Sequence, residues 1–331
     1  MVQLFCIVGP TAVGKSELSA DVAARLGAEI VSADAFQIYQ GFDVLSGKPD
    51  PATLEMAPHH LIGSVATNED MSAGKYRALA LPVITEISSR RKLPLIVGGS
   101  GLYVKALTHG LDDLPAGDSD LREELDPLSV DELRARLTDI DPQSAERVDM
   151  KNRRRLVRAI EIAMLSGRSA SKQRTQWGSD EIRKDAALEA PPAVANRRSL
   201  VRSSDGAGGK GFTHSGVFVF RDREDLYQRI NQRVEAMLRN GAIDEVRNAA
   251  SLSATAQQMI GVGEIRKHLA GETSLAQCTA AIQQATRRYA KRQLTWFRHQ
   301  TTLEALNLSL LNHNEAVERV VRQAVAGARG E

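Results

Sequence analysis

The sequence predicts an α/β protein with a parallel sheet and a helical insertion, and three observations support this class. Short apolar runs of strand length alternate with helical patterns early in the chain, which is typical of a parallel sheet. A glycine-rich loop, Gly9–Ser16, lies between the first apolar run and a helical pattern. From Leu111 to Arg174 every pattern is helical, so a helical segment is inserted between two parts of the sheet.

Composition sets broad limits on the class of protein. The 331 residues are 42% apolar and 25% charged, which is ordinary for a soluble globular chain. No apolar run approaches the roughly 20 residues that span a bilayer, and Met1 leads directly into the first strand. Cys6 and Cys278 are the only cysteines and lack metal-ligand spacing. We therefore expect a cytoplasmic protein with no signal peptide and no membrane partner.

The first strand, Leu4–Val8, is followed by Gly9-Pro10-Thr11-Ala12-Val13-Gly14-Lys15-Ser16 and a helix that ends at Gly27. This is the motif G-x-x-x-x-G-K-[ST] in the strand, loop and helix context that defines a phosphate-binding loop. Backbone N–H groups, the helix N-terminus and Lys15 bind phosphate, and the Ser16 hydroxyl is a candidate Mg²⁺ ligand. The pattern predicts a P-loop NTPase-like core that holds a di- or triphosphate.

Two further strands end in polar residues. The strand Ala28–Ala33 leads to Asp34, and the strand Leu93–Val97 leads to Gly98-Gly99-Ser100-Gly101. Carboxyl ends of parallel strands line the ligand crevice of an open sheet, so both ends face the phosphate loop. A P-loop hydrolase has an aspartate at the end of such a strand. Its absence after Val97 indicates a phosphate bound as a leaving group, although Asp34 has the simpler reading of a loop cap.

The middle of the chain is predicted to be irregular over 35–71, helical over 72–91 and helical again through the insertion. The insertion contains helical pieces at 118–125, 129–137, 142–148 and 152–165. Five of the eight residues in Lys151–Arg158 are basic. Such a run is either a solvated face or a contact with anions. The adjacent His59 and His60 are interpreted as structural residues rather than metal ligands.

Residues 177–215 have no periodicity and predict a flexible loop. The core resumes with a strand at 216–220 and a helix over 223–239, with Arg221 and Arg223 at their junction. The helix over 274–299 contains five Lys/Arg residues and no acid between Cys278 and Gln300. Cations combined with Tyr289 and Trp296 are what nucleic-acid contact requires, but the periodicity is equally compatible with a solvated face over buried aromatics. One more helix follows Asn312. The predicted divisions are 1–113 and 216–331 for the core, 114–176 for the insertion and 177–215 for the loop.

Taken together, the motifs resemble the bacterial tRNA dimethylallyltransferase family, also called tRNA isopentenyltransferases. The resemblance covers nearly the whole chain outside the 177–215 loop, and its most specific part is the closing Lys-Arg-Gln-x-Thr-Trp segment. In chain order, its segments are Gly9–Ser16, Ser32–Asp34, Gln37–Tyr39, Gly47–Pro49, Pro58–Ile62, Val97–Tyr103, Arg154–Glu161, Leu226–Ile230, Gln258–Gly261 and Thr286–Phe297.

The resemblance implies transfer of a dimethylallyl group from dimethylallyl diphosphate to N6 of the adenosine immediately 3′ of the anticodon, nucleotide 37. The implied substrates are tRNAs that read codons beginning with U, bound through their anticodon stem–loop. It implies Mg²⁺ as cofactor and a protein that acts as a monomer. The target base must leave the stack of the anticodon loop to reach the site.

The resemblance also implies residue roles. Asp34 would be the general base, and the other two catalytic residues, Ser100 and Lys15, would stabilise the negative charge of the leaving diphosphate. The diphosphate site would comprise Gly9, Pro10, Thr11, Ala12, Val13, Gly14, Lys15, Ser16 and Arg223, with Ser16 also holding the metal. The tRNA would contact Asp34, Ala35, Phe36, Gln37, Ser100, Arg154, Arg155, Arg158, Gly261, Arg287, Arg288, Lys291, Arg292, Gln293, Trp296 and Arg298.

Three residues, at two places in the chain, depart from the family pattern. Ser100 stands where members commonly have Thr, and Val262-Gly263 replaces the usual Tyr-Lys before Glu264. The alternative function is a P-loop kinase of a nucleotide or small metabolite. Such a kinase would share the loop, the sheet and the helical insertion, but it would not require the basic and aromatic closing helix.

Overall fold

The structure is a computed structural model that describes residues 2–111, 114–115, 117–167 and 212–329. The chain divides into two compact units, one formed by Met1–His109 with Leu188–Glu331 and the other by Gly110–Ala187. We call them the core unit and the helical unit. Most of the predicted loop at 177–215 lies outside the described residues. The described part, from Phe212, is not loop but the start of a strand.

Six parallel strands form the sheet of the core unit, in the order β3-β2-β4-β1-β5-β6. The central strand, β1, pairs with β4 on one side and β5 on the other, with Ile7 opposite Val97 and Val217. The strands are β1 (Val2–Val8), β2 (Glu29–Ser32), β3 (His59–His60), β4 (Pro94–Gly98), β5 (Phe212–Phe220) and β6 (Glu304–Asn307). The predicted parallel sheet is confirmed, and β5 is longer than predicted because it pairs with β1 from Val2 onward.

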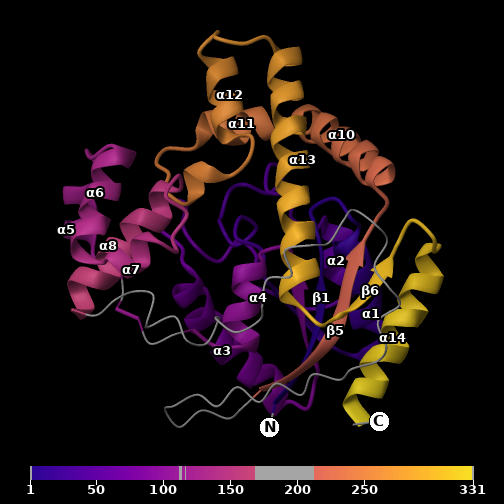
Figure 1. Ribbon diagram of the computed structural model, residues 1–331. Helices are drawn as coiled ribbons and strands as arrows, with labels where there is room; N and C mark the ends of the chain where they lie inside the picture. Colours follow the sequence, from indigo (N-terminus) through magenta and orange to yellow (C-terminus); the bar gives the residue numbers. More distant parts are fainter. Residues whose placement is uncertain (1, 112–113, 116, 168–211, 330–331) are drawn as a thin grey trace. The chain divides into compact units, whose positions relative to one another are not determined.

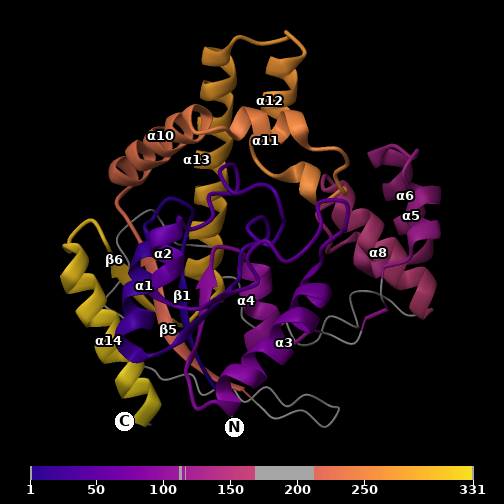
Figure 2. The same ribbon diagram turned by 180° about the vertical axis from the view of Figure 1, so that it is seen from behind.

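Helices cover both faces of this sheet, as Figure 1 and Figure 2 show. On one face lie α1 (Lys15–Leu26) and α14 (His313–Arg329), and on the other lie α3 (Ala73–Ser89) and α4 (Gly101–Thr108). The ends of α1 and α3 follow from the sequence. Gly27 ends α1 in the left-handed conformation with φ of 60°, and the Ser72 hydroxyl accepts from Lys75 N at 3.2 Å at the start of α3.

Most of the remaining core helices lie toward the carboxyl ends of the strands (Figure 1). They are α10 (Arg223–Arg239), α11 (Ala242–Asn248), a 3₁₀ turn (Ala256–Gln258), α12 (Val262–Leu269) and the long α13 (Leu275–Gln300), whereas the short α2 (Pro51–Met56) packs against α1. The segment 35–71, predicted to be irregular, contains both α2 and β3. These short elements lack a detectable period, which explains why the prediction was wrong there.

The two histidines of β3 have structural partners. His60 Nε2 lies 2.8 Å from Glu29 Oε2, and His59 Nδ1 lies 2.8 Å from the Ala57 carbonyl oxygen. Glu29 is only 1% exposed and also contacts Arg90 and Lys92. Among the described residues no group of three or more His, Cys, Asp or Glu side chains could hold a metal ion.

The helical unit has a core of its own, formed mainly by leucines from three helices. Its elements are α5 (Ser119–Leu125), α6 (Val130–Ile140), α7 (Pro142–Ala145) and α8 (Arg153–Ser166). Leu125, Leu137 and Leu156 are completely buried there. Ser129 and Glu132 form a capping box at the start of α6, and Asn152 caps α8. The predicted helical insertion is confirmed.

No helix in the described part of the chain is long and apolar enough to cross a membrane.

Candidate active site

The phosphate loop joins β1 to α1 and curls over the end of the sheet. Gly14 immediately precedes α1 with φ of 100°, and Ala12 also has a positive φ of 62°. Gly9 packs so closely on β5 that a Cβ atom there would lie 2.2 Å from the Val219 carbonyl oxygen. The first turn of α1 carries unpaired N–H groups and the positive end of the helix dipole, so this geometry is suited to binding an anion.

Lys15 is the cation that the motif places inside this loop. Its Nζ donates to the Pro10 carbonyl oxygen at 2.6 Å, which folds the side chain back over the loop. Burial lowers the pKa of Lys15 to about 8. The Arg233 cation lowers this pKa further, whereas the Asp34 carboxylate raises it. Lys15 therefore lies within electrostatic reach of both Asp34 and Arg233.

Asp34 follows β2 at the carboxyl edge of the sheet, as predicted. Its Oδ1 accepts hydrogen bonds from Phe36 N at 2.9 Å and Gln37 N at 3.3 Å. These bonds are those of a loop cap, which was the simpler interpretation of Asp34 from the sequence. The same carboxylate also acts on the pKa values of Lys15 and Tyr289, so it faces the phosphate loop and the basic helix as well.

Ser100 connects the ends of β2 and β4. Its Oγ accepts from Ala35 N at 2.9 Å, and its backbone N donates to the Ala33 carbonyl oxygen at 3.1 Å. The two strand ends touch at Gly98, where a Cβ atom would lie 2.1 Å from Ala33 O. The glycines after β4 thus permit the close approach that brings Ser100 beside Asp34.

Three arginines that the sequence analysis did not assign to the site hold the phosphate loop by its backbone and by one hydroxyl. Arg221 Nε donates to Val13 O at 2.9 Å and Arg229 Nε to Ala12 O at 3.0 Å. Arg233 contacts the Thr11 hydroxyl at 3.4 Å and approaches Gly47, where a Cβ atom would collide with its guanidinium. The sequence indicates these arginines only weakly, through the i, i+4 spacing that places Arg229 and Arg233 on one face of α10.

The predicted arginine of the diphosphate site lies elsewhere. Arg223 is exposed at the start of α10, with its guanidinium carbon 5.3 Å from the centre of the Tyr227 ring. Arg221, two residues earlier, occupies the place beside the loop instead. Residues two apart share a face in a continuing strand, but the helix α10 begins at Arg223, so the strand period does not show which of the two arginines meets the loop.

The basic helix α13 presents two different faces. Arg288, Lys291, Arg292 and Arg298 are exposed, as contact with a nucleic acid requires. On the inner face, the Tyr289 ring centre lies 6.5 Å from that of Phe36, and a Cβ atom at Gly101 would lie 2.2 Å from the Trp296 ring. Both readings of this helix therefore apply, each to one face.

Two residues that were assigned to tRNA contact on α13 are used inside the protein. Arg287 donates to Asn231 Oδ1 at 2.6 Å and lies over the Tyr227 ring, so it ties α13 to α10. Gln293 is only 6% exposed, and both ends of its amide are bonded to backbone groups.

The residues after Asp34 and at the start of α12 also have internal contacts. Gln37 Nε2 donates to Gly47 O at 2.8 Å, and Phe36 lies 6.5 Å from Tyr289 between ring centres. Ala35 offers its backbone N to Ser100. Gly261 is buried with φ of 105°, and a Cβ atom there would lie 2.6 Å from Leu45. In the described structure, these positions make contacts within the protein.

The helical unit divides its basic run in the same way as α13. Arg154 and Arg155 are exposed. Arg158 donates to Glu161 Oε2 at 3.2 Å and to Pro115 O at 2.7 Å, and Arg153 donates to Leu125 O at 2.9 Å. Two of the basic residues, Arg153 and Arg158, thus hold the helices of this unit together, while Arg154 and Arg155 lie on its exposed surface.

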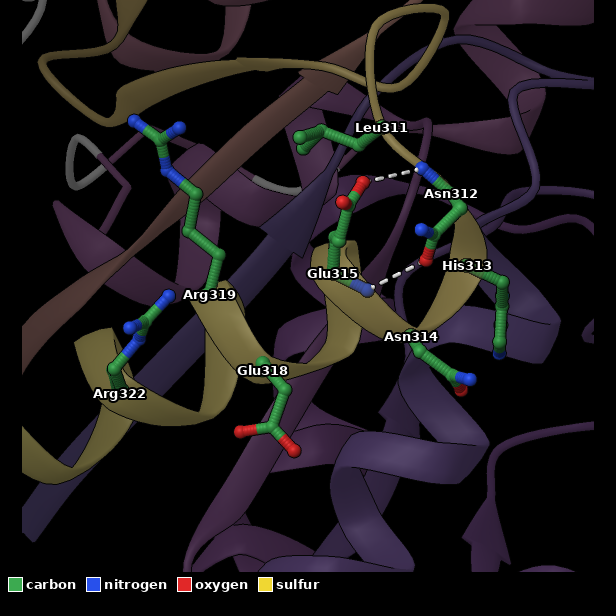
Figure 3. Close-up of a pocket in the computed structure, with 8 residues that line it drawn as sticks. All are labelled: Leu311, Asn312, His313, Asn314, Glu315, Glu318, Arg319 and Arg322. Atoms are coloured by element: carbon green, nitrogen blue, oxygen red, sulfur yellow. Dashed lines mark hydrogen bonds between the residues drawn. The ribbon is translucent and has the colours of Figure 1, made fainter.

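Two hollows lie near α14. A cavity of about 750 Å³, drawn in Figure 3, is lined by Leu311–Glu315, Glu318, Arg319 and Arg322, and contains no predicted site residue. Glu315 and Asn312 form reciprocal hydrogen bonds there, which cap the helix (Figure 3). A smaller cavity of about 250 Å³ is lined by Gly14, Arg221 and Arg229. The smaller one adjoins the phosphate loop and belongs to the site.

Comparison with known proteins places this geometry in a family. The family model described as IPP transferase matches residues 37–300. The tRNA dimethylallyltransferase of Caulobacter sp. strain K31 is 39% identical over 307 residues, which are 90% of this chain and 90% of that protein. The tRNA dimethylallyltransferase 1 of Citrifermentans bemidjiense is 36% identical over 300 residues, 89% of each chain.

Solved structures agree with this assignment. The tRNA isopentenylpyrophosphate transferase of Bacillus halodurans is 32% identical with a TM-score of 0.66, covering 99% of this chain and 96% of that one. A eukaryotic dimethylallyltransferase acting on tRNA has a TM-score of 0.76 at 21% identity, covering 100% and 80%, and this likeness supports the fold. The chain described here belongs to the IPP transferase family.

Proposed function

We propose that this protein is a tRNA dimethylallyltransferase, which transfers the dimethylallyl group of dimethylallyl diphosphate to N6 of the adenosine immediately 3′ of the anticodon. The observation that carries the proposal is the pairing of a phosphate loop with Asp34, at an edge where β4 ends in Gly98-Gly99-Ser100. That arrangement holds a diphosphate beside a carboxylate base without the aspartate that hydrolysis of a nucleotide employs.

Asp34 serves as the general base of the transfer. The exocyclic amine of adenine is a poor nucleophile because its lone pair is delocalised into the ring. As N6 bonds to C1 of the dimethylallyl group, the bond between C1 and the diphosphate oxygen breaks, and the N6 proton passes to Asp34. The two backbone bonds to Oδ1 hold the carboxylate in a fixed orientation.

The phosphate loop stabilises the leaving diphosphate. Negative charge develops on the bridging oxygen as the bond to C1 breaks, and Lys15 together with the amides of the loop offers fixed positive charge to it. Arg229 and Arg233 add two further cations at the same place while their bonds to Ala12 O and Thr11 Oγ1 hold the loop in shape.

The residues of the loop also suit Mg²⁺. This ion keeps most of its water and typically takes one or two protein ligands together with phosphate oxygens. Ser16 stands at the first turn of α1, where its hydroxyl would be such a ligand beside a bound diphosphate. Bound there, Mg²⁺ would neutralise part of the diphosphate charge.

The exposed cations of α13 and of the helical unit bind the tRNA. Arg288, Lys291, Arg292 and Arg298 form one exposed group. Arg154 and Arg155 form another. Contacts of this kind fix the register of a nucleic acid through its phosphates, and the target base is then extruded into the pocket. We expect one protein chain to bind one tRNA as a monomer.

The test is mass spectrometry of digested tRNA after incubation with the purified protein, dimethylallyl diphosphate and Mg²⁺. The substrate is a tRNA that reads a codon beginning with U and has adenosine 3′ of its anticodon, and the control has guanosine at that position. A five-carbon mass gain on that adenosine alone supports the proposal. Consumption of ATP without any gain would favour the kinase alternative.

A further inference from the structure

Gln293 is the side chain that joins the two catalytic loops. Its Oε1 accepts a hydrogen bond from Thr11 N at 2.9 Å, and its Nε2 donates to Gly99 O at 2.8 Å. Thr11 belongs to the phosphate loop and Gly99 to the loop that carries Ser100. One amide group on α13 therefore links the two loops, next to the direct backbone bond from Gly9 N to Gly98 O at 3.3 Å.

The surroundings of Gln293 show that this bridge is built into the fold. A Cβ atom at Gly99 would lie 2.3 Å from Nε2 of Gln293 and 3.1 Å from Gly9 O, so only glycine leaves room for the amide. Gln293 itself is 6% exposed. Breaking one of its bonds would leave a buried backbone group without its partner, which is costly.

Neighbouring residues on the same face of α13 extend the contact. Tyr289 lies one turn before Gln293; burial raises the pKa of its hydroxyl, and the neighbouring Ser100 and Gln293 side chains act against that rise. Trp296, one turn after, packs against Gly101. This inner face touches the end of β4 at three successive residues, and it touches the phosphate loop through Gln293 alone among the described hydrogen bonds of α13.

We propose that Gln293 is a positioning residue for the transfer reaction: it fixes the phosphate loop relative to Ser100 and Asp34, so that the allylic carbon of the bound donor lies in line with the acceptor amine. This inference rests on the proposed function and adds a role to a residue that the family resemblance would assign to tRNA contact. Displacing a bound reactant by about 1 Å can reduce a rate by roughly 100-fold.

The first variant is Gln293→Met, which keeps the length of the side chain and removes both hydrogen bonds. We expect kcat to fall by about 10- to 100-fold, with the KM for tRNA within threefold of the parent protein. The matched control is Gln283→Met, on the same helix. Gln283 Nε2 lies 3.4 Å from Asn231 O and contacts neither catalytic loop in the described structure. The kcat of Gln283→Met should therefore stay within twofold of the parent protein.

The second variant, Gln293→Glu, tests the bridge by pH. When protonated, a carboxylic acid has the same donor and acceptor pattern as an amide, so it restores both bonds. When ionised, it repels the Gly99 carbonyl and the donor diphosphate. Since position 293 is buried, desolvation raises the pKa of such a group. The ratio of kcat for Gln293→Glu to kcat for the parent should therefore rise as the pH falls from 8 toward 6.

Three results would overturn the inference. An unchanged kcat in Gln293→Met would show that the separation of the loops is set by other contacts. A raised KM for tRNA with unchanged kcat would return Gln293 to tRNA binding. A ratio for Gln293→Glu that stays flat with pH would exclude the hydrogen-bond bridge. In each case the parent protein still modifies tRNA, which separates this failure from failure of the proposed function, where the parent itself produces no five-carbon gain.

Discussion

The helical unit and the phosphate loop of the core unit pair their charged groups with different partners. In the helical unit, Glu161 has no exposure and is bonded to Arg122 at 2.7 Å and to Arg158. In the core unit, Arg229 and Arg233 donate to carbonyl and hydroxyl oxygens, which have no net charge. The internal ion pairs neutralise themselves and hold helices together. The cations at the phosphate loop keep a charge for a ligand.

This difference predicts that substitutions in the core unit change catalysis, whereas those in the helical unit change stability. The sharpest test is Asp34→Asn, because the amide oxygen still accepts from Phe36 N and Gln37 N while the base is lost. We expect kcat to fall by about 100- to 10,000-fold, measured as incorporation of label from the donor into tRNA. The dissociation constant for tRNA should stay within about twofold, and normal turnover would exclude Asp34 as the base.

Glu161→Gln makes the corresponding change in the helical unit. The substitution leaves Arg122 and Arg158 without their carboxylate. Because both arginines are partly exposed, we expect the free energy of unfolding to fall by about 2 kcal/mol, which is less than for a fully buried pair. Hydrogen exchange should show faster opening of α5 and α8 while kcat at low temperature is retained. A large drop in kcat with unchanged exchange would break the comparison between the units.

The two faces of α13 provide the next comparison. Replacing the exposed Arg288 and Arg292 by Ala should weaken tRNA binding by about tenfold at low salt and lower the slope of log K against log salt by about 1 to 2. Arg287→Ala is the matched control because Arg287 is bonded to Asn231, and its slope should not change. Filter binding at several salt concentrations distinguishes these outcomes. Equal slopes for all variants would mean that the outer face is merely solvated.

Lys15 extends the comparison to pH. Burial lowers the pKa of Lys15 to about 8 in the protein without ligand, so the cation is present below that pH and is lost above it. We expect kcat/KM for dimethylallyl diphosphate to fall by up to about tenfold per pH unit above 8, while kcat at saturating donor changes less, because bound diphosphate stabilises the cation. A profile of kcat/KM that is flat from pH 7 to 10 would contradict this assignment.

The smallest expected effect is at the departure from the family pattern on α12. Gly263 is exposed in the helix, and a Cβ atom there would meet nothing within 4 Å. Gly263→Ala should stabilise the protein by about 0.5–1 kcal/mol. Gly261→Ala should destabilise it, since φ is 105° and Leu45 is too close. Thermal denaturation should therefore show a higher Tm for Gly263→Ala and a lower Tm for Gly261→Ala than for the parent protein.

The sequence predicted the parts of the site that depend on position along a strand. Asp34 and Ser100 follow apolar strands, and the topology of a parallel sheet then brings them to the phosphate loop. It did not predict Arg229 and Arg233, because a helical period places residues on a common face without telling whether that face meets a loop or water. Gln293 was assigned to tRNA for the same reason, although its side chain lies on the inner face.

The fold shows the same limit. Long elements with a clear period were predicted within a few residues, including α10, which spans Arg223–Arg239 as predicted. The short edge strands β3 and β6 were missed because two and four residues cannot display a period. These strands exist through pairing with β2 and β5, which is a tertiary effect.

The place of β1 in the sheet has a consequence for how the chain is made. Its partners, β4 and β5, begin at Pro94 and Phe212, and synthesis at about 5–20 residues per second separates their appearance by several seconds or more. During that interval, β1 has one paired edge and one free, apolar edge in a nascent chain. Such an edge is open to pairing with other chains, and the core unit acquires its final sheet only after the helical unit has been synthesised.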